Sequence, residues 1–373
     1  MAPFEKVRGN FGFGFMRLPM NGEEVDYERV CEMVDRFMEA GFNYFDTAHG
    51  YIDGKSEIAL KKCLTSRYPR ESYVIANKLS TNFFKKEEDI LPVFESQLEA
   101  TGVDYFDFYL MHSQNERLFL KYKSAKAYEI AARLKEEGRI KHLAISFHDS
   151  AAVLDNILTE YPIIEAVQIQ LNYIDFDDPC VEAEKCYEVC RRHGKPIIVM
   201  EPVKGGCLVN LPPDARAVFD ELGGSPASYA IRFAAGFEGV FMVLSGMGSI
   251  DMVRENVSFM KDFKPLDERE RDAVQRVRSI LRGKALVQCT NCRYCVSECP
   301  KGIPIPNFFT SINERRLFNS WQAESFYIVS SRKAGAKAED CIECGACEDI
   351  CPQKLPIREL LKEVSREFDK REN

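Results

Sequence analysis

The 373-residue chain lacks the segments that would carry it into or across a membrane. No apolar run approaches the ~20 residues that a transmembrane helix needs. The first residues, Met1–Lys6, lack the apolar core of a signal peptide, so we expect a cytoplasmic protein with reduced thiols. Neither sign of charge is concentrated: the formal net charge of -8 comes from mixed acidic and basic residues. This pattern disfavours nucleic acid as a partner.

The chain also lacks a complete dinucleotide-binding fingerprint. Gly12 and Gly14 lie near the start, but the third glycine of G-x-G-x-x-G is missing, which disfavours a doubly wound sheet. What the first ~260 residues do contain is eight short β-rich runs that alternate with amphipathic helical patterns. Eight such repeats over ~250 residues predict an α/β fold of the (β/α)8 TIM-barrel type.

The expected strands are Phe11–Met16, Phe42–Asp46, Tyr73–Asn77, Tyr105–Met111, His142–Ser146, Glu165–Ile169, Pro196–Met200 and Val240–Leu244. Helical patterns between them include Glu57–Ser66, Glu88–Thr101, Ala125–Glu137, Val181–His193, Pro226–Ala235 and Ser249–Lys261. We expect residues 1–265 to form the barrel, a charged linker helix over 266–282, and a smaller α-rich domain over 283–373.

Cysteine is abundant, and eight of the fourteen cysteines form one pattern written twice. Each run reads C-x2-C-x2-C-x3-C and is followed by a proline. The runs are Cys289, Cys292, Cys295 and Cys299, then Cys341, Cys344, Cys347 and Cys351. This is the thiolate spacing of bacterial-type 4Fe-4S ferredoxins, so the tail is expected to be ferredoxin-like and to bind two clusters.

In ferredoxins of this type the fourth cysteine of each run ligates the other cluster. The resemblance implies one cluster on Cys289, Cys292, Cys295 and Cys351, and a second on Cys341, Cys344, Cys347 and Cys299. Zinc sites and disulfides are the alternatives, but zinc favours paired cysteines or histidines and disulfides suit small secreted domains. We expect the clusters, more than a hydrophobic core, to stabilise this tail. Its aromatic insertion, Ile303–Ala338, would cover a barrel mouth or fill the tail's own core.

Chemistry-bearing residues stand at the carboxyl ends of three consecutive predicted strands. Asp46 ends the second strand, with Tyr51 just beyond it, Lys78 follows the third, and His112 follows the fourth. Catalytic residues of TIM barrels occupy these ends. The segments Tyr44–Tyr51, Val74–Lys78 and Asp107–His112 resemble the catalytic tetrad of aldo-keto reductases, and the likeness extends through Ser56-Glu57, Ala144–Phe147, Val167-Gln168 and Glu255-Asn256.

The full length resembles the aldo-keto reductases that carry a C-terminal dicluster ferredoxin domain. In that family, reduction of a carbonyl needs a hydride on carbon and a proton on oxygen. The resemblance implies that Tyr51 donates the proton, Lys78 stabilises the phenolate, and Asp46 keeps Lys78 charged and oriented. His112 would hydrogen-bond the substrate carbonyl and fix its angle to the hydride donor.

The resemblance also implies a cofactor site for NADP(H) or NAD(H). Ser146 and Gln168 match positions that hold the nicotinamide amide, and Thr47 lies where its ribose is contacted. The segment Glu201-Pro202-Val203-Lys204-Gly205-Gly206 matches the loop that wraps the pyrophosphate, and the expected contacts there are Pro202, Val203, Gly205 and Gly206. The adenosine end would use Gly246, Met247, Arg254 and Asn256. Two departures stand out: Met200 replaces a stacking tyrosine, and Met252 replaces an arginine that NADP-selective members carry.

Three interpretations of the whole chain stay open at this point. The first is a nicotinamide-dependent carbonyl reductase or alcohol dehydrogenase, whose clusters serve structure or assembly. The second is an electron-transfer oxidoreductase of anaerobic metabolism, with a redox protein partner and a flavin, because nicotinamide moves electron pairs and clusters move single electrons. The third is a non-enzymatic redox-sensing module. The intact tetrad argues against the third, because a docking module has no use for it. We expect the first, with a small carbonyl or alcohol substrate and no flavin.

Overall fold

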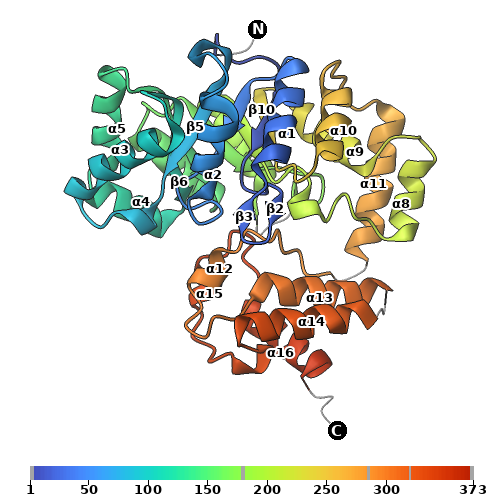
Figure 1. Ribbon diagram of the computed structural model, residues 1–373. Coiled ribbons are helices and arrows are strands. Elements are labelled where there is room, and N and C mark those ends of the chain that lie inside the picture. The colour runs from blue at the N-terminus through green and yellow to red at the C-terminus, as the bar shows by residue number, and fades with distance from the viewer. Residues whose placement is uncertain (1–3, 178–180, 284–285, 319–320, 370–373) are drawn as a thin grey trace. The chain divides into compact units, whose positions relative to one another are not determined.

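The computed structural model describes residues 4–177, 181–283, 286–318 and 321–369 (Figure 1). The chain divides into two compact units, each assembled from two stretches of sequence. The first unit comprises Met1–Pro202 and Ala230–Leu266, and the second comprises Val203–Tyr229 and Asp267–Asn373. Residues 203–229, which the sequence assigned to the barrel, therefore group with the cysteine-rich tail.

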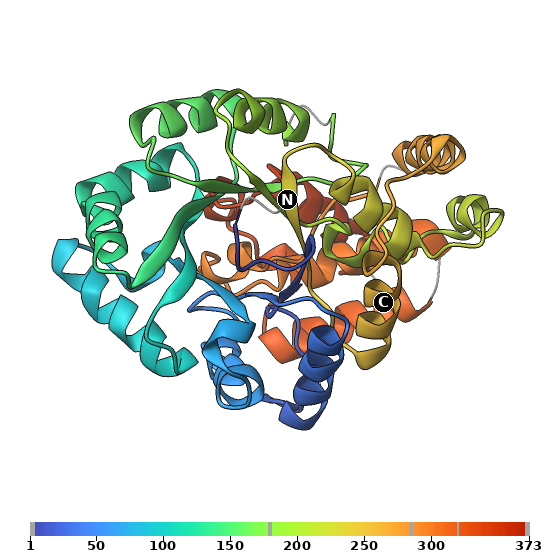
Figure 2. The same ribbon diagram turned by 90° about the horizontal axis from the view of Figure 1, so that it is seen from above.

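The first unit is built around a closed barrel of parallel strands, with helices outside it (Figure 2). The strand order β1-β10-β9-β8-β7-β6-β5-β4 places neighbours in sequence beside each other, which confirms the predicted (β/α)8 topology. The barrel strands are β1 (Phe11–Gly14), β4 (Tyr44–Asp46), β5 (Val74–Leu79), β6 (Phe106–Gln114), β7 (Ile140–Phe147), β8 (Ala166–Gln170), β9 (Ile197–Met200) and β10 (Val240–Ser245).

The outer helices follow from capping residues and apolar spacing. In α1, the Asp26 side chain accepts a hydrogen bond from the backbone N of Arg29, and the buried residues recur every three or four positions from Val30 to Phe37. The α-helices of this layer are α1 (Tyr27–Glu39), α2 (Lys55–Leu60), α3 (Ile90–Thr101), α4 (Glu116–Ser124), α5 (Ala127–Glu136), α6 (Ala151–Glu160), α7 (Ala183–Arg192), α9 (Pro226–Ala235), which crosses the unit boundary, and α10 (Ile250–Met260).

Short elements escaped prediction because they carry no hydrophobic periodicity. A two-stranded hairpin joins β2 (Met20–Asn21) to β3 (Glu24–Val25), and the expected helix after Glu57 changes to a π-helical turn over Lys61–Thr65. Single-turn 3-10 segments lie at Arg70–Ser72, Thr81–Phe83 and Glu87–Asp89. Within the described ranges, no helix combines the length and apolar character that a bilayer crossing requires.

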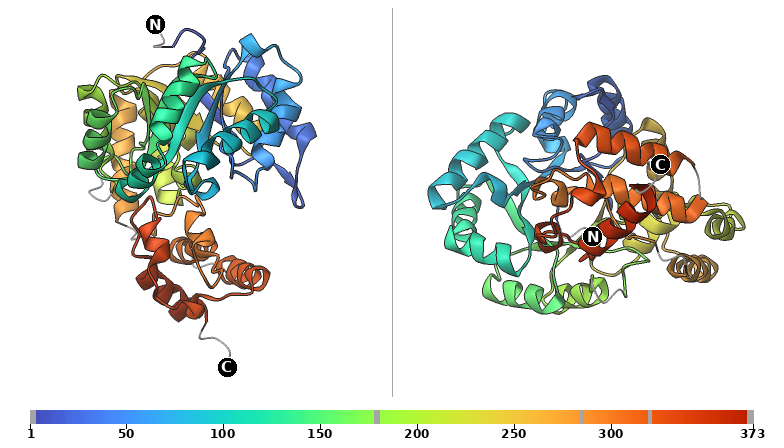
Figure 3. Two further views of the ribbon diagram at one scale, coloured as in Figure 1. Left: turned by 90° about the vertical axis from the view of Figure 1, so that its left-hand side faces the viewer. Right: turned by 90° about the horizontal axis from the view of Figure 1, so that it is seen from below.

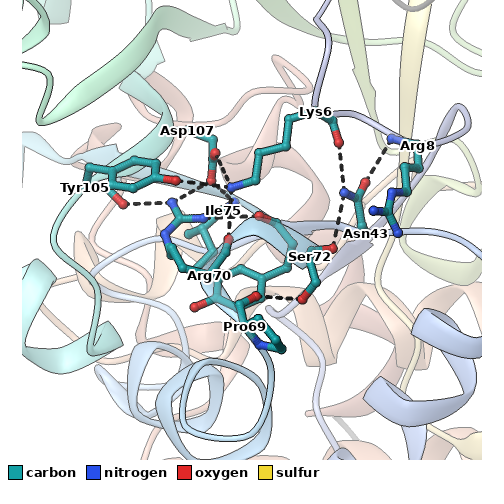
Figure 4. A network of polar contacts seen from close by, with 10 residues as sticks. Lys6, Arg8, Asn43, Pro69, Arg70, Ser72, Ile75, Tyr105 and Asp107 are labelled. Atoms are coloured by element: carbon teal, nitrogen blue, oxygen red, sulfur yellow. Dashed lines mark hydrogen bonds and ion pairs between the residues drawn. The ribbon is translucent and has the colours of Figure 1, made fainter.

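The amino end of the barrel is closed by the chain's N-terminal segment. Phe4 packs edge-on against Phe108 at 4.8 Å between ring centroids, and it contacts Phe241 at 4.9 Å. Asn43 ties the same segment down, since its Oδ1 accepts from the backbone N of Arg8 and its Nδ2 donates to the carbonyl of Lys6 (Figure 4). The segment therefore fills the barrel floor.

A buried carboxylate anchors this floor. Asp107 accepts hydrogen bonds from Lys6 Nζ at 2.9 Å, from Arg70 Nη2 at 2.7 Å and from the backbone N of Ile75 at 2.8 Å (Figure 4). Both carboxylate oxygens thus have partners, and two cations balance one anion. Burial of a charge is tolerated when the charge is paired and hydrogen-bonded in this way.

The second unit is helical and has a hydrophobic core of its own. Helices α13, α14 and α16 pack together (Figure 3), and α8 packs against α11. Phe308, Phe309 and Tyr327 lie in the core, so these aromatics of the insertion fill the tail itself, and the expectation of little core was wrong. The elements are α8 (Pro213–Asp220), α11 (Glu268–Arg282), α12 (Tyr294–Ser297), α13 (Ile305–Phe318), α14 (Trp321–Ala334), α15 (Ala346–Asp349), α16 (Ile357–Phe368), and 3-10 turns at Lys204–Gly206 and Ala338–Asp340.

Candidate active site

The carboxyl end of the barrel holds a buried ion pair. Asp46 ends β4 and Lys78 lies in β5, and the Lys78 Nζ donates to Asp46 Oδ1 at 2.6 Å and to the carbonyl of Thr47 at 2.7 Å. The side chains are 5% and 1% exposed. Burial lowers the pKa of Lys78 and raises that of Asp46, and the mutual attraction of the pair opposes both shifts. Asp46 Oδ2 is buried without a hydrogen-bond partner among the described residues.

Tyr51 faces this pair from the loop that follows β4. The loop turns back tightly, because Ile52, Asp53 and Gly54 all have positive φ, and it brings the tyrosine over the lysine. The Lys78 Nζ lies 5.0 Å from the centroid of the Tyr51 ring. The His112 ring meets the Tyr51 ring edge-on, with centroids 5.9 Å apart. The structure therefore gathers all residues of the predicted tetrad at one barrel end.

His112 is fixed by neighbours that the sequence did not indicate. Its Nδ1 is 2.6 Å from Ser80 Oγ, and its backbone N–H donates to the hydroxyl of Tyr122 at 3.0 Å. Burial lowers the pKa of His112 well below its usual value, and the positive charge of Lys78 lowers it further. A neutral imidazole that accepts the Ser80 hydroxyl proton at Nδ1 carries its own proton on Nε2.

Behind the tetrad lies a buried polar network centred on Glu57. Its carboxylate accepts from Asn77 Nδ2 at 2.7 Å and from Gln97 Nε2 at 3.3 Å, and it contacts His49 Nδ1 at 2.7 Å. Gln97 Nε2 also donates to the carbonyl of Lys78 at 2.9 Å. This network holds the backbone of β5 behind the lysine. The sequence contained Glu57 within the matched segments, but gave it no role.

The nicotinamide-binding residues predicted from the resemblance end two neighbouring strands. Ser146 and Gln168 are paired in the register of β7 and β8. Ser146 Oγ accepts from the backbone N of Ser113 at 2.8 Å, while Gln168 Oε1 is buried and has no partner among the described residues. An unpaired buried amide oxygen costs free energy unless a ligand satisfies it. The carboxamide N–H2 of a nicotinamide has the donor that this oxygen lacks. Thr47 Oγ1 is instead bonded to Ser56 Oγ at 2.7 Å.

The predicted adenosine end follows β10. Asn256 Nδ2 donates to Ser245 Oγ at 3.2 Å, and Met247 is buried. Gly246 packs closely on the side chain of Arg17, since a Cβ there would lie 3.2 Å from Arg17 Cδ. Sequence reasoning missed this arginine, which follows β1 and whose backbone carbonyl also lies close to Gly248.

Arg254 has carboxylate partners on the surface of the barrel. Its guanidinium lies 3.3 Å from Glu32 and 3.4 Å from Asp251, and its side chain is 54% exposed. Met252 is also exposed, and its sulfur accepts from the backbone N of Gly248 at 3.4 Å. The structure thus gives Arg254 local ion-pair partners rather than a site reserved for phosphate.

The predicted phosphate loop divides at the unit boundary: Pro202 belongs to the first unit, whereas Val203, Gly205 and Gly206 belong to the second. Gly205 has a positive φ of 64° and lies against the backbone of Thr290, where a Cβ would come 2.3 Å from the carbonyl oxygen. Only glycine fits there.

The second set of predicted thiolates surrounds one cavity. Cys299 lines it together with Cys341, Cys344 and Cys347, although Cys299 belongs to the first run in sequence. Burial raises the pKa of Cys347 to about 11, and Cys341 and Cys299 are among the charges that add to the shift. Across the described residues, no three His, Cys, Asp or Glu side chains are grouped tightly enough for a single metal ion. Four thiols around a cavity fit the donor chemistry of a cluster.

The remaining four thiols are close enough to influence each other. Burial raises the pKa of Cys289 to about 12, and the charges of Cys292 and Cys351 raise it further. Burial likewise raises the pKa of Cys295, with contributions from the same partners. Cys351, from the second run, therefore neighbours the first run, as Cys299 neighbours the second.

The comparisons with known proteins agree with this geometry. The family model for the aldo/keto reductase family matches residues 10–279, and a model for a 4Fe-4S dicluster domain matches residues 288–355. An uncharacterized oxidoreductase of Schizosaccharomyces pombe is 27% identical over 266 residues, which cover 68% of this chain and 82% of that protein. The NADH-specific methylglyoxal reductase of Escherichia coli is 26% identical, over 48% of this chain and 58% of its own length.

Solved structures show the same barrel. An aldo-keto reductase from Bacillus halodurans in its holo form superposes with a TM-score of 0.58 at 25% identity, over 72% of this chain and 91% of that one. An aldo-keto reductase from Klebsiella pneumoniae in complex with NADPH gives 0.59 at 17% identity, over 72% and 90%. With its tetrad residues at one barrel end and its thiols in two groups, the chain is an oxidoreductase of the aldo/keto reductase family that also carries a 4Fe-4S dicluster domain.

Proposed function

We propose that the protein reduces a small-molecule carbonyl, or oxidises the corresponding alcohol, with NADP(H) or NAD(H), and that Tyr51 is the proton donor. The observation that carries this proposal is the gathering of Tyr51, Lys78, Asp46 and His112 at the carboxyl end of the barrel. A charge on the surface, or a histidine that only packs in the core, would not require the other three of these residues beside it.

Each residue has a task in the proton transfer. Tyr51 gives its hydroxyl proton to the substrate oxygen, and the Lys78 ammonium beneath its ring stabilises the phenolate that remains. Asp46 holds that ammonium in place through the 2.6 Å bond to Oδ1. The Glu57 network fixes the strand that carries the lysine. The bound nicotinamide supplies the hydride.

His112 orients the substrate. Since burial holds the pKa of His112 well below its usual value, the imidazole is neutral, and in the tautomer whose Nδ1 accepts from Ser80 the Nε2–H can donate to the substrate carbonyl. A donor aimed at the oxygen polarises the carbonyl and aligns it with the hydride donor. The histidine acts as a hydrogen-bond donor and Tyr51 as the acid, so the two roles do not compete.

The buried Gln168 Oε1 supports a nicotinamide site, and the relatives differ in the nicotinamide that their names give, NADH in one and NADPH in another. Arg254 does not distinguish NADPH from NADH, because its guanidinium already pairs with Glu32 and Asp251. We therefore propose a nicotinamide cofactor without choosing between the two. Comparing kcat/KM for NADH and NADPH makes that choice.

The tail is proposed to hold two 4Fe-4S clusters, with Cys299 and Cys351 crossing between the runs. The cavity that joins Cys299 to the second run supports the crossing. About eight irons per chain are expected after anaerobic purification. About four irons, or zinc, would contradict two clusters.

The test of the catalytic proposal is Tyr51→Phe. We expect turnover to fall by ~10²–10⁴-fold, since this is the range for a positioned acid, with little change in nicotinamide affinity. Tyr44→Phe is a matched control, because Tyr44 is a buried tyrosine two positions before Asp46 in β4. Equal activity of Tyr51→Phe and the parent enzyme would refute the assignment.

The role of the clusters is tested by anaerobic spectroscopy. If the clusters serve structure, NADH or NADPH leaves their visible absorbance unchanged during carbonyl reduction, and no flavin is released on denaturation. Bleaching of the clusters, or substrate reduction driven by an artificial one-electron donor without nicotinamide, would favour the electron-transfer interpretation instead.

A further inference from the structure

Lys204 has an unusual position for a lysine on a loop. It is fully buried, and its Nζ donates to Oε1 of Gln353 at 3.1 Å. Lysine is almost never fully buried unless its ammonium is paired or hydrogen-bonded. Gln353 is also buried, and it follows Cys351 by two residues. Both residues belong to the second unit.

The loop that carries Lys204 also contacts the segment of Cys289, which belongs to the same set of thiols as Cys351. Gly205 lies on the backbone of Thr290, and the thiol of Cys207 donates to the carbonyl of Cys289 at 3.7 Å. The loop is therefore held against Cys289 on one side and against the segment after Cys351 on the other. Those two cysteines are proposed ligands of one cluster.

Gln353 links the ammonium to the segment that directly follows a proposed ligand. It lies two residues after Cys351, and its side-chain oxygen accepts from Lys204. Hydrogen bonds to the sulfurs, net charge and solvent exposure are the factors with which a protein sets the potential of a cluster. Lys204 can act on the net charge beside the cluster.

We propose that Lys204 is a positioning residue for the cluster of Cys289, Cys292, Cys295 and Cys351, and that its buried ammonium raises the reduction potential of that cluster. The inference rests on the two clusters proposed above. A reduced cluster carries one more negative charge than an oxidised one, so a cation held in a dry environment stabilises the reduced form. No bond forms or breaks in this step, and only the energy of the added electron changes.

The second cysteine run supplies a matched control. Lys301 follows Cys299 by two residues, as Gln353 follows Cys351, and it lines the cavity of the other thiols. Lys301 is exposed, however, so water and salt screen its charge. If burial gives Lys204 its influence, removal of the Lys301 charge has a much smaller effect on its own cluster.

The experiment is an EPR-monitored redox titration of the full-length protein and its variants. Lys204→Met removes the charge and the hydrogen bond at similar volume, Lys204→Gln keeps a donor without the charge, and Lys301→Met is the control. Cys292→Ser identifies the titration step of the first cluster. Iron content and thermal unfolding are measured on each variant, so that a misfolded protein is recognised.

We expect the ratio of reduced to oxidised first cluster, at a fixed potential, to fall about tenfold in Lys204→Met, which is about 59 mV for one electron. Lys204→Gln should show a fall of similar size, and Lys301→Met less than a threefold change in either cluster. An unchanged midpoint in both Lys204 variants with eight irons would overturn the inference. So would an equal shift in Lys301→Met. A parent protein with only four irons would instead refute the two-cluster proposal on which the inference rests.

Discussion

Asp107 at the amino end of the barrel and Asp46 at the carboxyl end are both buried carboxylates, and they differ in how completely they are paired. Asp107, at the amino end, accepts from two cations and a backbone N–H through both oxygens. Asp46, at the carboxyl end, has the lysine on Oδ1 but no described partner on Oδ2. Gln168, at the same end, has an unpaired oxygen too.

This difference separates a group that stabilises the fold from one that serves chemistry. A carboxylate whose two oxygens both have hydrogen-bond partners contributes to stability, and it offers a ligand no unpaired oxygen to bind. A buried oxygen without a protein partner costs free energy, and such groups persist where binding or catalysis makes use of them. We therefore expect substitutions at the amino end to change stability and those at the carboxyl end to change turnover.

The largest expected effect is at the carboxyl end. Lys78→Met should lower kcat by ~10²–10⁴-fold, because the phenolate of Tyr51 loses the cation that stabilises it. Steady-state kinetics on protein that elutes as folded material would measure the loss. Lys185→Met, which removes a lysine whose side chain is 63% exposed on α7, is the control. Activity within threefold of the parent would mean that the buried pair is structural at this end as well.

Asp107→Asn should produce the opposite pattern. It leaves Lys6 and Arg70 without their anion, and we expect a loss of about 3 kcal/mol in the free energy of unfolding, the lower part of the range for broken buried pairs. Turnover per folded molecule should stay within about threefold of the parent. Urea unfolding and kinetics on one preparation test both statements. A large fall in turnover at unchanged stability would contradict the assignment of the amino end to stability and of the carboxyl end to catalysis.

Ser80→Ala should have a smaller effect. Without the hydroxyl, His112 loses the neighbour that selects its Nε2–H form, and we expect kcat/KM to fall about tenfold, below the ~10²–10⁴-fold effect of removing a positioned acid–base group itself. Ser80→Thr, which keeps the hydroxyl, should recover most of the activity. Nitrogen NMR of labelled histidine would report the change of tautomer directly.

The smallest expected effect is a pH dependence of stability. Because burial depresses the pKa of His112, the unfolded chain takes up a proton near pH 6.5 that the folded chain refuses. Stability therefore falls as the pH drops below about 6.5, by at most about 1.4 kcal/mol per pH unit from this group. His112→Gln should reduce this slope in unfolding measurements at pH 7.5 and 5.5. An unchanged slope would place the titrating group elsewhere.

The sequence allowed prediction of the barrel and of the tetrad, because both depend on local patterns. Asp46, Lys78 and His112 each sit in or just beyond an apolar run, and parallel strands bring such positions to one end. The surroundings of His112 could not be predicted, since Ser80 directly follows the neighbouring strand β5 and only the register of β5 and β6 places the two residues together.

Other features depended on contacts between distant segments. The grouping of residues 203–229 with the tail follows from packing of α8 on α11 and of Gly205 on Thr290, and neither contact leaves a periodic signal. The core of the tail was underestimated for the same reason, because Phe308, Tyr327 and Phe368 meet only after three helices have packed.

The construction of the second unit from two stretches also limits how evolution could reuse it. A ferredoxin encoded as one continuous block can be gained or lost by a single recombination event at its edge. Here, a block that began at Asp267 would leave behind Val203–Tyr229, and with it Lys204 and the glycine that fits against Thr290. Transplanting the tail alone onto another barrel would therefore transfer an incomplete module.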